Sequence, residues 1–208
     1  MTKEEWITAL ELRHGADLQR KFLSASVAVC GLGGLGSNVA ITLARTGVGT
    51  LHLIDFDRVE ISNLHRQQYK VSQLGTNKTE AMKQTLAEIT PYCNIITHTV
   101  KLTEEKISLI ADCNIVCECF DDAQYKAILV NSVAERFPDK YIVAASGMSG
   151  LHTGNAIKTE KYGKRLYICG DGTSDISHDG TLFASRVMLC AAHQANTVLR
   201  IIAGKFEV

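Results

Sequence analysis

The sequence predicts an α/β fold: a doubly wound, Rossmann-like and mostly parallel sheet with helices on both faces. Two observations predict it. A short apolar run, residues 26–30, leads directly into a glycine-rich turn, and short apolar runs then alternate with helix-like segments as far as residue 145. Such alternation is typical of parallel strands that are joined by helical crossovers.

The first unit of the predicted sheet is a strand, a turn, a helix and a second strand. We expect a buried strand at Ser26–Cys30, a helix from about Ser37 to Arg45, and a strand at Thr50–Ile54. The helix carries apolar residues at helical spacing on one side, which indicates the face that packs on the sheet.

The following segments repeat this pattern. We expect helices over residues 4–22, 78–89, 103–111 and 122–137, and strands over residues 94–100, 115–119 and 141–145. After Ser146 glycines become frequent, so we expect antiparallel strands and loops there, and then a long C-terminal helix from about Leu182 to Ala203. We interpret residues 1–208 as one domain, with residues 1–22 as a helical extension.

Composition argues against several classes of protein. The 208 residues contain 22 Lys and Arg and 22 Asp and Glu, so the basic field of a duplex nucleic-acid binder is absent. The longest apolar stretch, residues 181–204, is interrupted by two arginines and a histidine, which is unsuitable for a bilayer span. We expect no secretory signal, because residues 1–22 mix acidic, basic and scattered apolar residues. The seven cysteines lack the spacing of a disulfide framework. We therefore expect a cytoplasmic protein without nucleic-acid or membrane partners.

The segment GLGGLG after the first strand fits the G-x-G-x-x-G motif. Gly31 permits the tight turn, and Gly36 lets the helix pack closely. Gly33 and Gly34 leave the backbone bare for phosphates, which the amides of the helix N-terminus attract. Asp55, at the end of the next strand, is placed to accept hydrogen bonds from ribose hydroxyls. A nucleotide is expected, and the motif alone leaves NAD, FAD and ATP open.

Charged residues beyond the strand ends favour ATP. Pyrophosphate that leaves ATP accumulates negative charge, and Arg66 and Lys78 are the candidates for the fixed cations that this requires. Asp121 and Asp122 follow the strand at 115–119, at the edge where a Mg²⁺ ion would meet the phosphates. Each residue also has a structural interpretation: Asp122 as a helix N-cap, Lys78 as a helix start, and Arg66 as a surface salt-bridge donor.

Together these residues resemble the ThiF/MoeB/HesA superfamily, relatives of the ubiquitin-activating enzymes. The similarity covers most of the chain and includes the glycine turn with Ser37, residues 55–67, Gly75 with Lys78, and Asp121. Residues 13–19, 66–69 and 191–196 resemble the short ThiF subfamily, which is assigned to activation of the sulfur carrier protein ThiS in thiamine thiazole synthesis.

The resemblance implies that ATP adenylates the C-terminal carboxylate of a small ubiquitin-like sulfur carrier ending in Gly-Gly, with release of pyrophosphate. It implies that Asp55 contacts the ribose, that Lys78 stabilises developing charge and that Asp121 holds Mg²⁺. Arg13 matches an arginine that reaches the partner's ATP site in a homodimer, although it is also explained as a helix-surface residue. The implied phosphate contacts are Gly34, Asn63, Arg66 and Gln67, and the wider set of nucleotide-binding candidates adds Asp57, Ser62, Leu64, His65 and Asp122.

The sequence departs from its relatives at three points. It has no C-x-x-C pair, so we expect no structural zinc. Asp122 stands where relatives commonly have asparagine. Cys169, in a loop-rich part, is the one candidate for a covalent cysteine, and a buried strand cysteine explains it equally well. The glycine-rich region over residues 146–180, especially Tyr162 to Asp175, is the candidate docking surface for the carrier, because mobile loops at the open edge of a sheet carry binding.

Three other functions stay open. An NAD- or FAD-dependent oxidoreductase fits the glycine motif but leaves Arg66, Lys78 and Asp121 unexplained. A non-catalytic partner subunit is disfavoured by the complete set of ATP-site residues. The third, within the same superfamily, is an adenylating enzyme for another substrate, such as a molybdopterin carrier, a peptide or a tRNA base.

Overall fold

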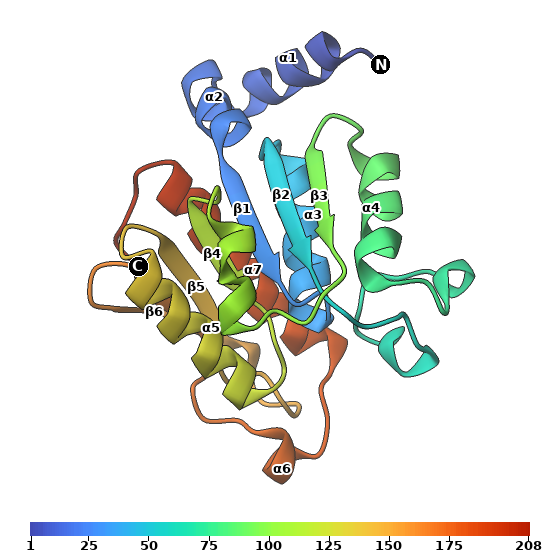
Figure 1. Cartoon of the computed structure of the whole chain (residues 1–208), viewed down its shortest axis with the longest axis vertical. Coiled ribbons are helices and arrows are strands. Elements are labelled where there is room, and N and C mark those ends of the chain that lie inside the picture. Colours follow the sequence, from blue (N-terminus) through green and yellow to red (C-terminus); the bar gives the residue numbers. More distant parts are fainter.

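A single seven-stranded sheet runs through the computed structural model, which describes residues 1–208 (Figure 1). The strand order is β3-β2-β1-β4-β5-β7-β6, and every neighbouring pair is parallel except β6 and β7. The predicted fold class is therefore confirmed. The strands are β1 (Ser26–Cys30), β2 (Thr50–Ile54), β3 (Asn94–His98), β4 (Ile115–Glu118), β5 (Tyr141–Ala145), β6 (Lys158–Tyr162) and β7 (Leu166–Gly170).

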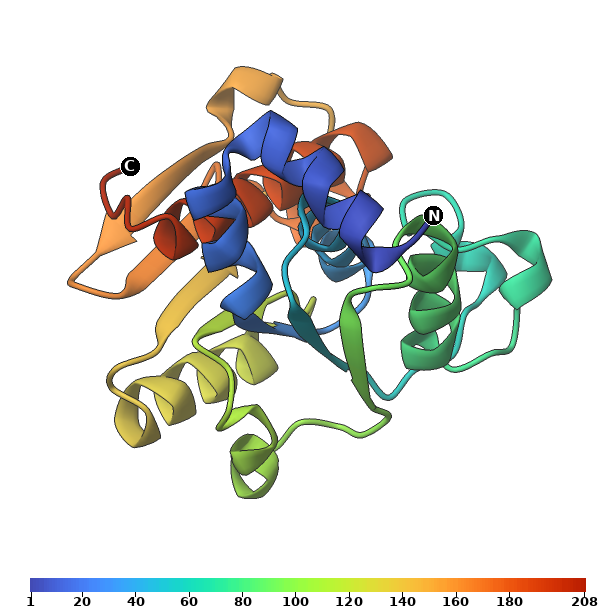
Figure 2. The ribbon, with the colours of Figure 1, turned by 90° about the horizontal axis from the view of Figure 1, so that it is seen from above.

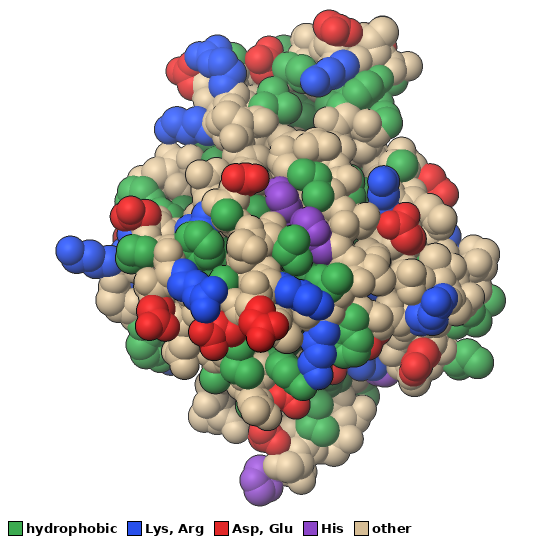
Figure 3. Space-filling model, viewed as in Figure 1, with side chains coloured by type: hydrophobic (Ala, Val, Ile, Leu, Met, Phe, Trp, Pro, Cys, Tyr) green, Lys and Arg blue, Asp and Glu red, His purple; other side chains and the backbone are tan.

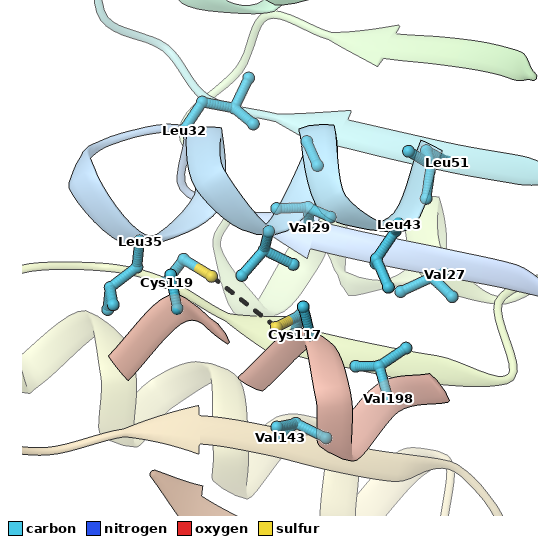
Figure 4. Packing of buried hydrophobic residues seen from close by; sticks show 14 of the residues in the cluster. Val27, Val29, Leu32, Leu35, Leu43, Leu51, Cys117, Cys119, Val143 and Val198 are labelled. Atoms are coloured by element: carbon cyan, nitrogen blue, oxygen red, sulfur yellow. Dashed lines mark hydrogen bonds between the residues drawn. The ribbon is translucent and has the colours of Figure 1, made fainter. Parts of the chain in front are cut away.

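Helices cover both faces of the sheet (Figure 2). The larger core cluster lies under α3 (Gly34–Thr46), α4 (Lys78–Ile89) and α7 (Ala184–Ile202). Figure 4 shows part of it, where side chains of β1, β4 and β5 meet those of α3 and α7. The smaller cluster lies under α5 (Ala123–Arg136) and the 3-10 helix η3 (Glu104–Ile110). The short elements are η1 (Ile61–Asn63), η2 (Val71–Gln73), η4 (Gly154–Ala156) and α6 (Ile176–Asp179).

Two predicted helices differ in the structure. The single helix expected over residues 4–22 is wrong: the segment forms α1 (Lys3–His14) and α2 (Ala16–Ser24), because Gly15 adopts a φ of 84° that ends the first helix. The α-helix expected over residues 103–111 is a 3-10 helix instead. Its two buried residues, Ile107 and Ile110, are three positions apart, which matches the repeat of a 3-10 helix.

Two further differences concern the start of α3 and the pairing of β7. α3 begins at Gly34 rather than near Ser37, because the glycine turn itself supplies the first turn of the helix. β7 pairs in parallel with β5 and antiparallel with β6, so the region after residue 146 extends the parallel sheet as well as supplying an antiparallel hairpin.

The surface carries mixed charge. On the face shown in Figure 3, Lys and Arg side chains lie among Asp and Glu side chains, and neither sign covers that face. None of the helices combines the length and the apolar character that a membrane span requires.

Candidate functional site

The glycine turn joins β1 to α3 at the carboxyl edge of the sheet. Gly31 has a φ of 93°, and a Cβ atom there would lie 2.8 Å from the carbonyl oxygen of Cys119, just beyond β4. A Cβ at Gly36 would overlap the carbonyl oxygen of Gly31. Both positions therefore require glycine on steric grounds, and the turn is held directly against the end of β4.

The N-terminus of α3 is open to an anion. Gly33 is the N-cap and no side chain caps this end. The first backbone hydrogen bond into the helix runs from the amide of Ser37 to the carbonyl of Gly33, at 3.1 Å. The amides of Gly34, Leu35 and Gly36 thus point out of the helix end, where an anion can accept from them.

Asp55 follows β2, and its carboxylate faces the glycine turn. Its Oδ2 accepts the amide of Leu32 at 2.6 Å, and its Oδ1 accepts the amide of Asp57 at 2.8 Å. Burial raises the pKa of Asp55, and the nearby Lys78 and the two amides oppose that rise. Because each oxygen has a second lone pair, the fixed carboxylate is still able to accept hydrogen bonds from a ligand.

Lys78 is the first residue of α4, yet its side chain points inward and is only 7% exposed. Its Nζ donates to Oδ2 of Asp57 at 2.8 Å, and its backbone amide donates to the Asp57 carbonyl at 2.9 Å. Lys78 therefore begins its helix and also supplies a fixed positive charge close to Asp55. The Asp57 carboxylate is half-exposed, so a bound anion can share the ammonium group with it.

The segment after η1 is tied down onto the N-terminal half of α3. The amide of Gln68 donates to the hydroxyl of Ser37 at 3.2 Å, and its side-chain amide donates to Oδ1 of Asn38 at 2.8 Å. The buried hydroxyl of Tyr69 donates to the carbonyl of Leu32 at 2.8 Å. Sequence analysis assigned no role to Gln68 and Tyr69, although both stand in the segment that carries the family resemblance.

These ties place Arg66 and Gln67 beside the glycine turn. The Cγ of Arg66 lies 3.6 Å from the position that a Cβ of Gly34 would take, and Nε2 of Gln67 lies 3.7 Å from the corresponding position at Gly33. Gln67 is buried, and its Oε1 has no hydrogen-bond partner within the chain. The side-chain amide of Gln67 is thus within reach of a phosphate group bound at the turn. The Arg66 side chain passes the turn with its aliphatic part, and its Nη1 donates to the carbonyl of Ser62 at 3.2 Å.

The other candidates in this segment have different surroundings. Oδ1 of the buried Asn63 accepts the amide of Glu60 at 3.0 Å and so closes the η1 turn. Leu64 packs against the larger core cluster. Ser62 and His65 are exposed, and the ring Nδ1 of His65 lies 2.8 Å from the Ser62 carbonyl.

Asp121 and Asp122 follow β4 at the same edge and have different partners. Oδ1 of Asp122 accepts the amides of Gln124 and Tyr125, at 2.8 and 3.1 Å, so Asp122 is the N-cap of α5. Asp121 is exposed and its carboxylate makes no hydrogen bond within the chain. One free carboxylate beside a phosphate site fits Mg²⁺, which commonly binds one or two carboxylates together with phosphate oxygens and water.

Arg13 is the one predicted site residue that the fold keeps away from this edge. It is exposed on α1, and the α1–α2 pair packs at the other end of α3, where Nε2 of Gln19 donates to the carbonyl of Gly47. Figure 1 shows α1 and α2 at the end of the sheet opposite to α6. Arg13 therefore does not reach the glycine turn of its own chain.

Six of the seven cysteines are buried, and Cys93 is partly buried. Cys169 is fully buried in β7, and burial raises the pKa of its thiol. This corrects the placement of Cys169 in a loop-rich part, since a buried thiol in a strand does not meet a carrier protein. The sulfur atoms of Cys117, in β4, and of Cys119, just beyond it, are 3.8 Å apart (Figure 4). No group of three or more His, Cys, Asp or Glu side chains is arranged to hold a metal ion.

The buried side chain of Arg186 joins the loop after β5 to the loop after β7. The sequence alone indicated no such role for this arginine. Arg186 forms an ion pair with Asp171 and also donates to the carbonyls of His152 and Thr153, at 2.8 and 2.9 Å. Beside this pair is a hollow of about 400 Å³. Its lining consists of His152, Ala156, Asp171, Thr173, Ser174, Asp175, His178 and Asp179.

With this geometry in place, comparison with known proteins decides the family. Residues 8–208 match the ThiF family. The chain belongs to the ThiF family. The match includes the whole sheet and the glycine turn at its carboxyl edge.

Curated relatives match this ThiF-family chain over part of their length. The molybdopterin-synthase adenylyltransferase of Haemophilus influenzae is 40% identical over 112 residues, which is 53% of this chain and 46% of that protein. The adenylyltransferase and sulfurtransferase UBA4 of Candida glabrata is 39% identical over 132 residues, 62% of this chain and 30% of that protein. The matched part is less than half the length of either relative.

Solved structures share the fold. Escherichia coli tRNA N6-threonylcarbamoyladenosine dehydratase in complex with ATP superposes with a TM-score of 0.84 and 21% identity, covering 97% of this chain and 95% of that one. Escherichia coli MccB with ATP gives a TM-score of 0.74 and 22% identity, covering 97% of this chain and 64% of that one. At such identities the similarity establishes the architecture of this ThiF-family chain.

Proposed function

We propose that this chain adenylates the C-terminal carboxylate of a small ubiquitin-like sulfur carrier of the ThiS type, for thiamine thiazole synthesis. The observation that carries the proposal is the open N-terminus of α3 with Arg66 packed against Gly34, together with Lys78 and the free carboxylate of Asp121 at the same edge of the sheet. The names of the curated relatives, adenylyltransferases, support the activity, and the ATP-bound structural neighbours support the nucleotide.

The proposed reaction is an in-line displacement at the α-phosphorus of ATP. A carboxylate oxygen of the carrier forms a bond to that phosphorus, and the bond from the α-phosphorus to the bridging α–β oxygen breaks. The electron pair leaves with pyrophosphate, and the carrier keeps an acyl-adenylate. The carboxylate is already ionised at neutral pH, so the step needs no general base from the protein.

The chain's residues then have roles that follow from their positions. Asp55 holds the ribose, and the amides at the start of α3 hold phosphate oxygens. Lys78 and Arg66 offset the charge that grows on the departing pyrophosphate. Gln67, buried beside Gly33, donates from its side-chain amide to the same phosphate chain.

Asp121 is the residue that would hold Mg²⁺. When bound, the ion supplies charge neutralisation at the phosphate oxygens of the leaving group. Because the Asp121 carboxylate has no partner within the chain, binding of a cation does not require an existing hydrogen bond to break.

The proposal includes a cytoplasmic homodimer. In one subunit Arg13 is far from the glycine turn, so its family role requires that it enter the site of a second subunit. The carrier would approach over the loops between β5 and α7, where the hollow beside Arg186 lies.

Mass spectrometry of carriers tests the proposal. Purified ThiS-type and molybdopterin-type carriers, each ending in Gly-Gly, are incubated separately with the protein, ATP and Mg²⁺. We expect the ThiS-type carrier to gain the mass of AMP, and a carrier truncated by its last two residues serves as the control. If only the molybdopterin-type carrier gains AMP, the thiamine assignment is overturned, and the proposed activity, adenylation of a sulfur carrier, still holds.

The alternative substrates have different support. The name of the Haemophilus influenzae relative supports a molybdopterin carrier, and a tRNA substrate is supported only by the shared fold of the dehydratase. Two outcomes would exclude any carrier protein as the substrate. AMP transfer to a peptide or to tRNA, with both carriers unmodified, would replace the proposed substrate. Reduction of NAD or FAD without any AMP transfer would favour an oxidoreductase.

A further inference from the structure

Glu118, the last residue of β4, is an acidic side chain with 0% exposure. Its two carboxylate oxygens accept hydrogen bonds from Nζ of Lys126 on α5, at 3.2 and 3.0 Å. The Lys126 side chain is 23% exposed, whereas the Glu118 carboxylate is buried and loses its hydration. An ion pair with such a buried charge contributes little stability compared with apolar side chains of the same volume. A contribution to stability therefore does not explain why a charged pair occupies this position.

The partners of the pair connect four pieces of backbone. Oε1 of Glu118 also accepts the amide of Phe120 at 2.6 Å, and the Glu118 carbonyl accepts Nε2 of Gln194 at 2.8 Å. Lys126 donates in addition to the carbonyl of Ala145, at the end of β5, at 3.0 Å. The end of β4, the turn after it, the second turn of α5 and the end of β5 are thus fixed to one another.

Asp121 lies inside this closed loop, between Glu118 and Lys126 in the chain. Its carboxylate has no hydrogen bond of its own, so its position depends on the backbone of the turn. The same turn borders the glycine turn, because a Cβ at Gly31 would lie 3.0 Å from the ring of Phe120. A shift of this turn would move Asp121 relative to the phosphate site.

We propose that Glu118 and Lys126 are positioning residues that hold the turn of β4 so that the Asp121 carboxylate meets Mg²⁺ at the nucleotide phosphates. This inference rests on the proposed function, since it assigns Asp121 to the metal. It predicts that loss of the pair weakens the effect of Mg²⁺ on ATP binding and leaves metal-free ATP binding unchanged.

Calorimetric titration of ATP at a series of Mg²⁺ concentrations tests the positioning role. We expect Glu118→Gln and Lys126→Met to need at least ~10-fold more Mg²⁺ than the wild type for half of the affinity gain, the scale for partners that orient a metal ligand. Lys126→Arg should stay close to the wild type, because it keeps the ion pair. Asp121→Asn removes the proposed Mg²⁺-binding carboxylate and shows the largest effect that the pair variants can have.

Val133→Ala is the matched control, since Val133 is buried on the same helix and its apolar side chain makes no hydrogen bond to the pair. Where a single variant does not fold, the double variant Glu118→Gln/Lys126→Met removes both charges and so avoids a lone buried charge. Pair variants that keep the wild-type Mg²⁺ dependence, or that lose metal-free ATP binding to the same extent, would overturn the inference.

Adenylation of the carrier by the wild-type chain is measured in the same series. Its absence would overturn the proposed function. Wild-type adenylation together with an unchanged Mg²⁺ dependence in the pair variants would overturn only the positioning role of Glu118 and Lys126.

Discussion

Buried charges at the carboxyl edge of the sheet are each held by a partner on another segment. Lys78 is paired with Asp57, Glu118 with Lys126, and Arg186 with Asp171. Such charges keep one position because leaving the partner would expose an unpaired charge in a poorly hydrated site. A fixed charge costs no reorganisation when negative charge develops in a transition state, which is the basis of the first prediction.

Replacement of Lys78 or Arg66 by alanine should keep the fold and lower ATP–pyrophosphate exchange at least ~100-fold, the scale for loss of a preorganised charge stabiliser. The fold should survive Lys78→Ala because the Asp57 carboxylate, which loses its partner, is half-exposed and can be hydrated by water. Lys70→Ala is the control, since Lys70 is an exposed cation paired with Glu88 outside the site. Near-normal exchange in both the Lys78 and Arg66 variants would contradict the proposed mechanism.

Asp171 should make the free energy of unfolding depend on pH in the acidic range. Burial disfavours its ionised form, but hydrogen bonds from the amides of Ser174 and Thr173 and the charge of Arg186 outweigh burial and lower the pKa from 3.8 to about 2. A lowered pKa stabilises the folded state at pH values above 3.8, and this contribution is lost as the pH falls towards 2.

Asp171→Asn should therefore lose roughly 2 kcal/mol of unfolding free energy at pH 7 and flatten the decline of stability between about pH 4 and pH 2. Urea unfolding at several pH values measures both effects. Asp139→Asn removes a carboxylate from an exposed pair with Arg165 and should change little. An equally steep decline in Asp171→Asn and the wild type would show that Asp171 is not the group responsible.

At the scale of elements, the glycine turn and the segment over residues 61–69 form one unit. The turn supplies bare amides, and the segment supplies Arg66 and Gln67 because Gln68 and Tyr69 anchor it on α3 and on Leu32. Two glycines of the turn have different surroundings. A side chain at Gly36 would overlap the backbone, whereas a Cβ at Gly33 would meet only Nε2 of Gln67, at 3.7 Å.

Gly33→Ala should thus separate binding from folding. We expect it to melt close to the wild type and to bind ATP about tenfold or more weakly, a loss of roughly 1.4 kcal/mol, because its methyl group stands where a phosphate approaches. Gly36→Ala should instead be destabilised by ~1–3 kcal/mol or more through overpacking. Thermal melts and ATP titrations compare the two variants, and equal ATP affinity in Gly33→Ala and the wild type would place the phosphates elsewhere.

At the scale of the whole molecule, the parallel strands bring residues from distant segments to one edge. Asp55 directly follows β2 and Asp121 lies in the turn after β4, and β1 with its glycine turn stands between these strands in the order β2-β1-β4. The α1–α2 pair packs at the opposite end, against Gly47. A single subunit accordingly contains every predicted site residue at this edge except Arg13.

Mixing two inactive variants tests whether sites are shared. If Arg13 acts in the site of its partner, a heterodimer of Arg13→Ala and Asp121→Ala contains one intact site. Activity should then return to at most roughly a quarter of the wild type after subunit exchange. Each variant mixed with itself serves as the control, and absence of recovery in exchanged dimers would remove the proposed role of Arg13.

Much of this fold follows from local patterns. β1, β2, β5 and α4 begin and end where the sequence predicts, because each is a short run with apolar residues at a regular period and with clear boundaries. The break at Gly15 was missed because a polar helix on the surface has no apolar period that would show an interruption. The 3-10 form of η3 was missed because three-residue and four-residue spacing are hard to distinguish in a seven-residue segment.

The site was predictable where function depends on backbone geometry and on residues that follow strands. Gly31, Gly36 and Asp55 lie where their motif requires, because the motif describes a local turn and the strand next to it. Asp122 is the N-cap that its position directly before a predicted helix indicates, because an acid at that point reaches the free amides of the first turn.

By itself, the sequence determined the alternation of strands and helices, the glycine turn and the family resemblance, because each depends on neighbours in the chain. Only the tertiary structure decided which charged groups are buried and paired. Lys78 became a fixed cation, Cys169 a core residue and Glu118 a buried anion through contacts with segments that are distant in the chain. Burial and pairing depend on packing between elements, and no local pattern encodes that packing.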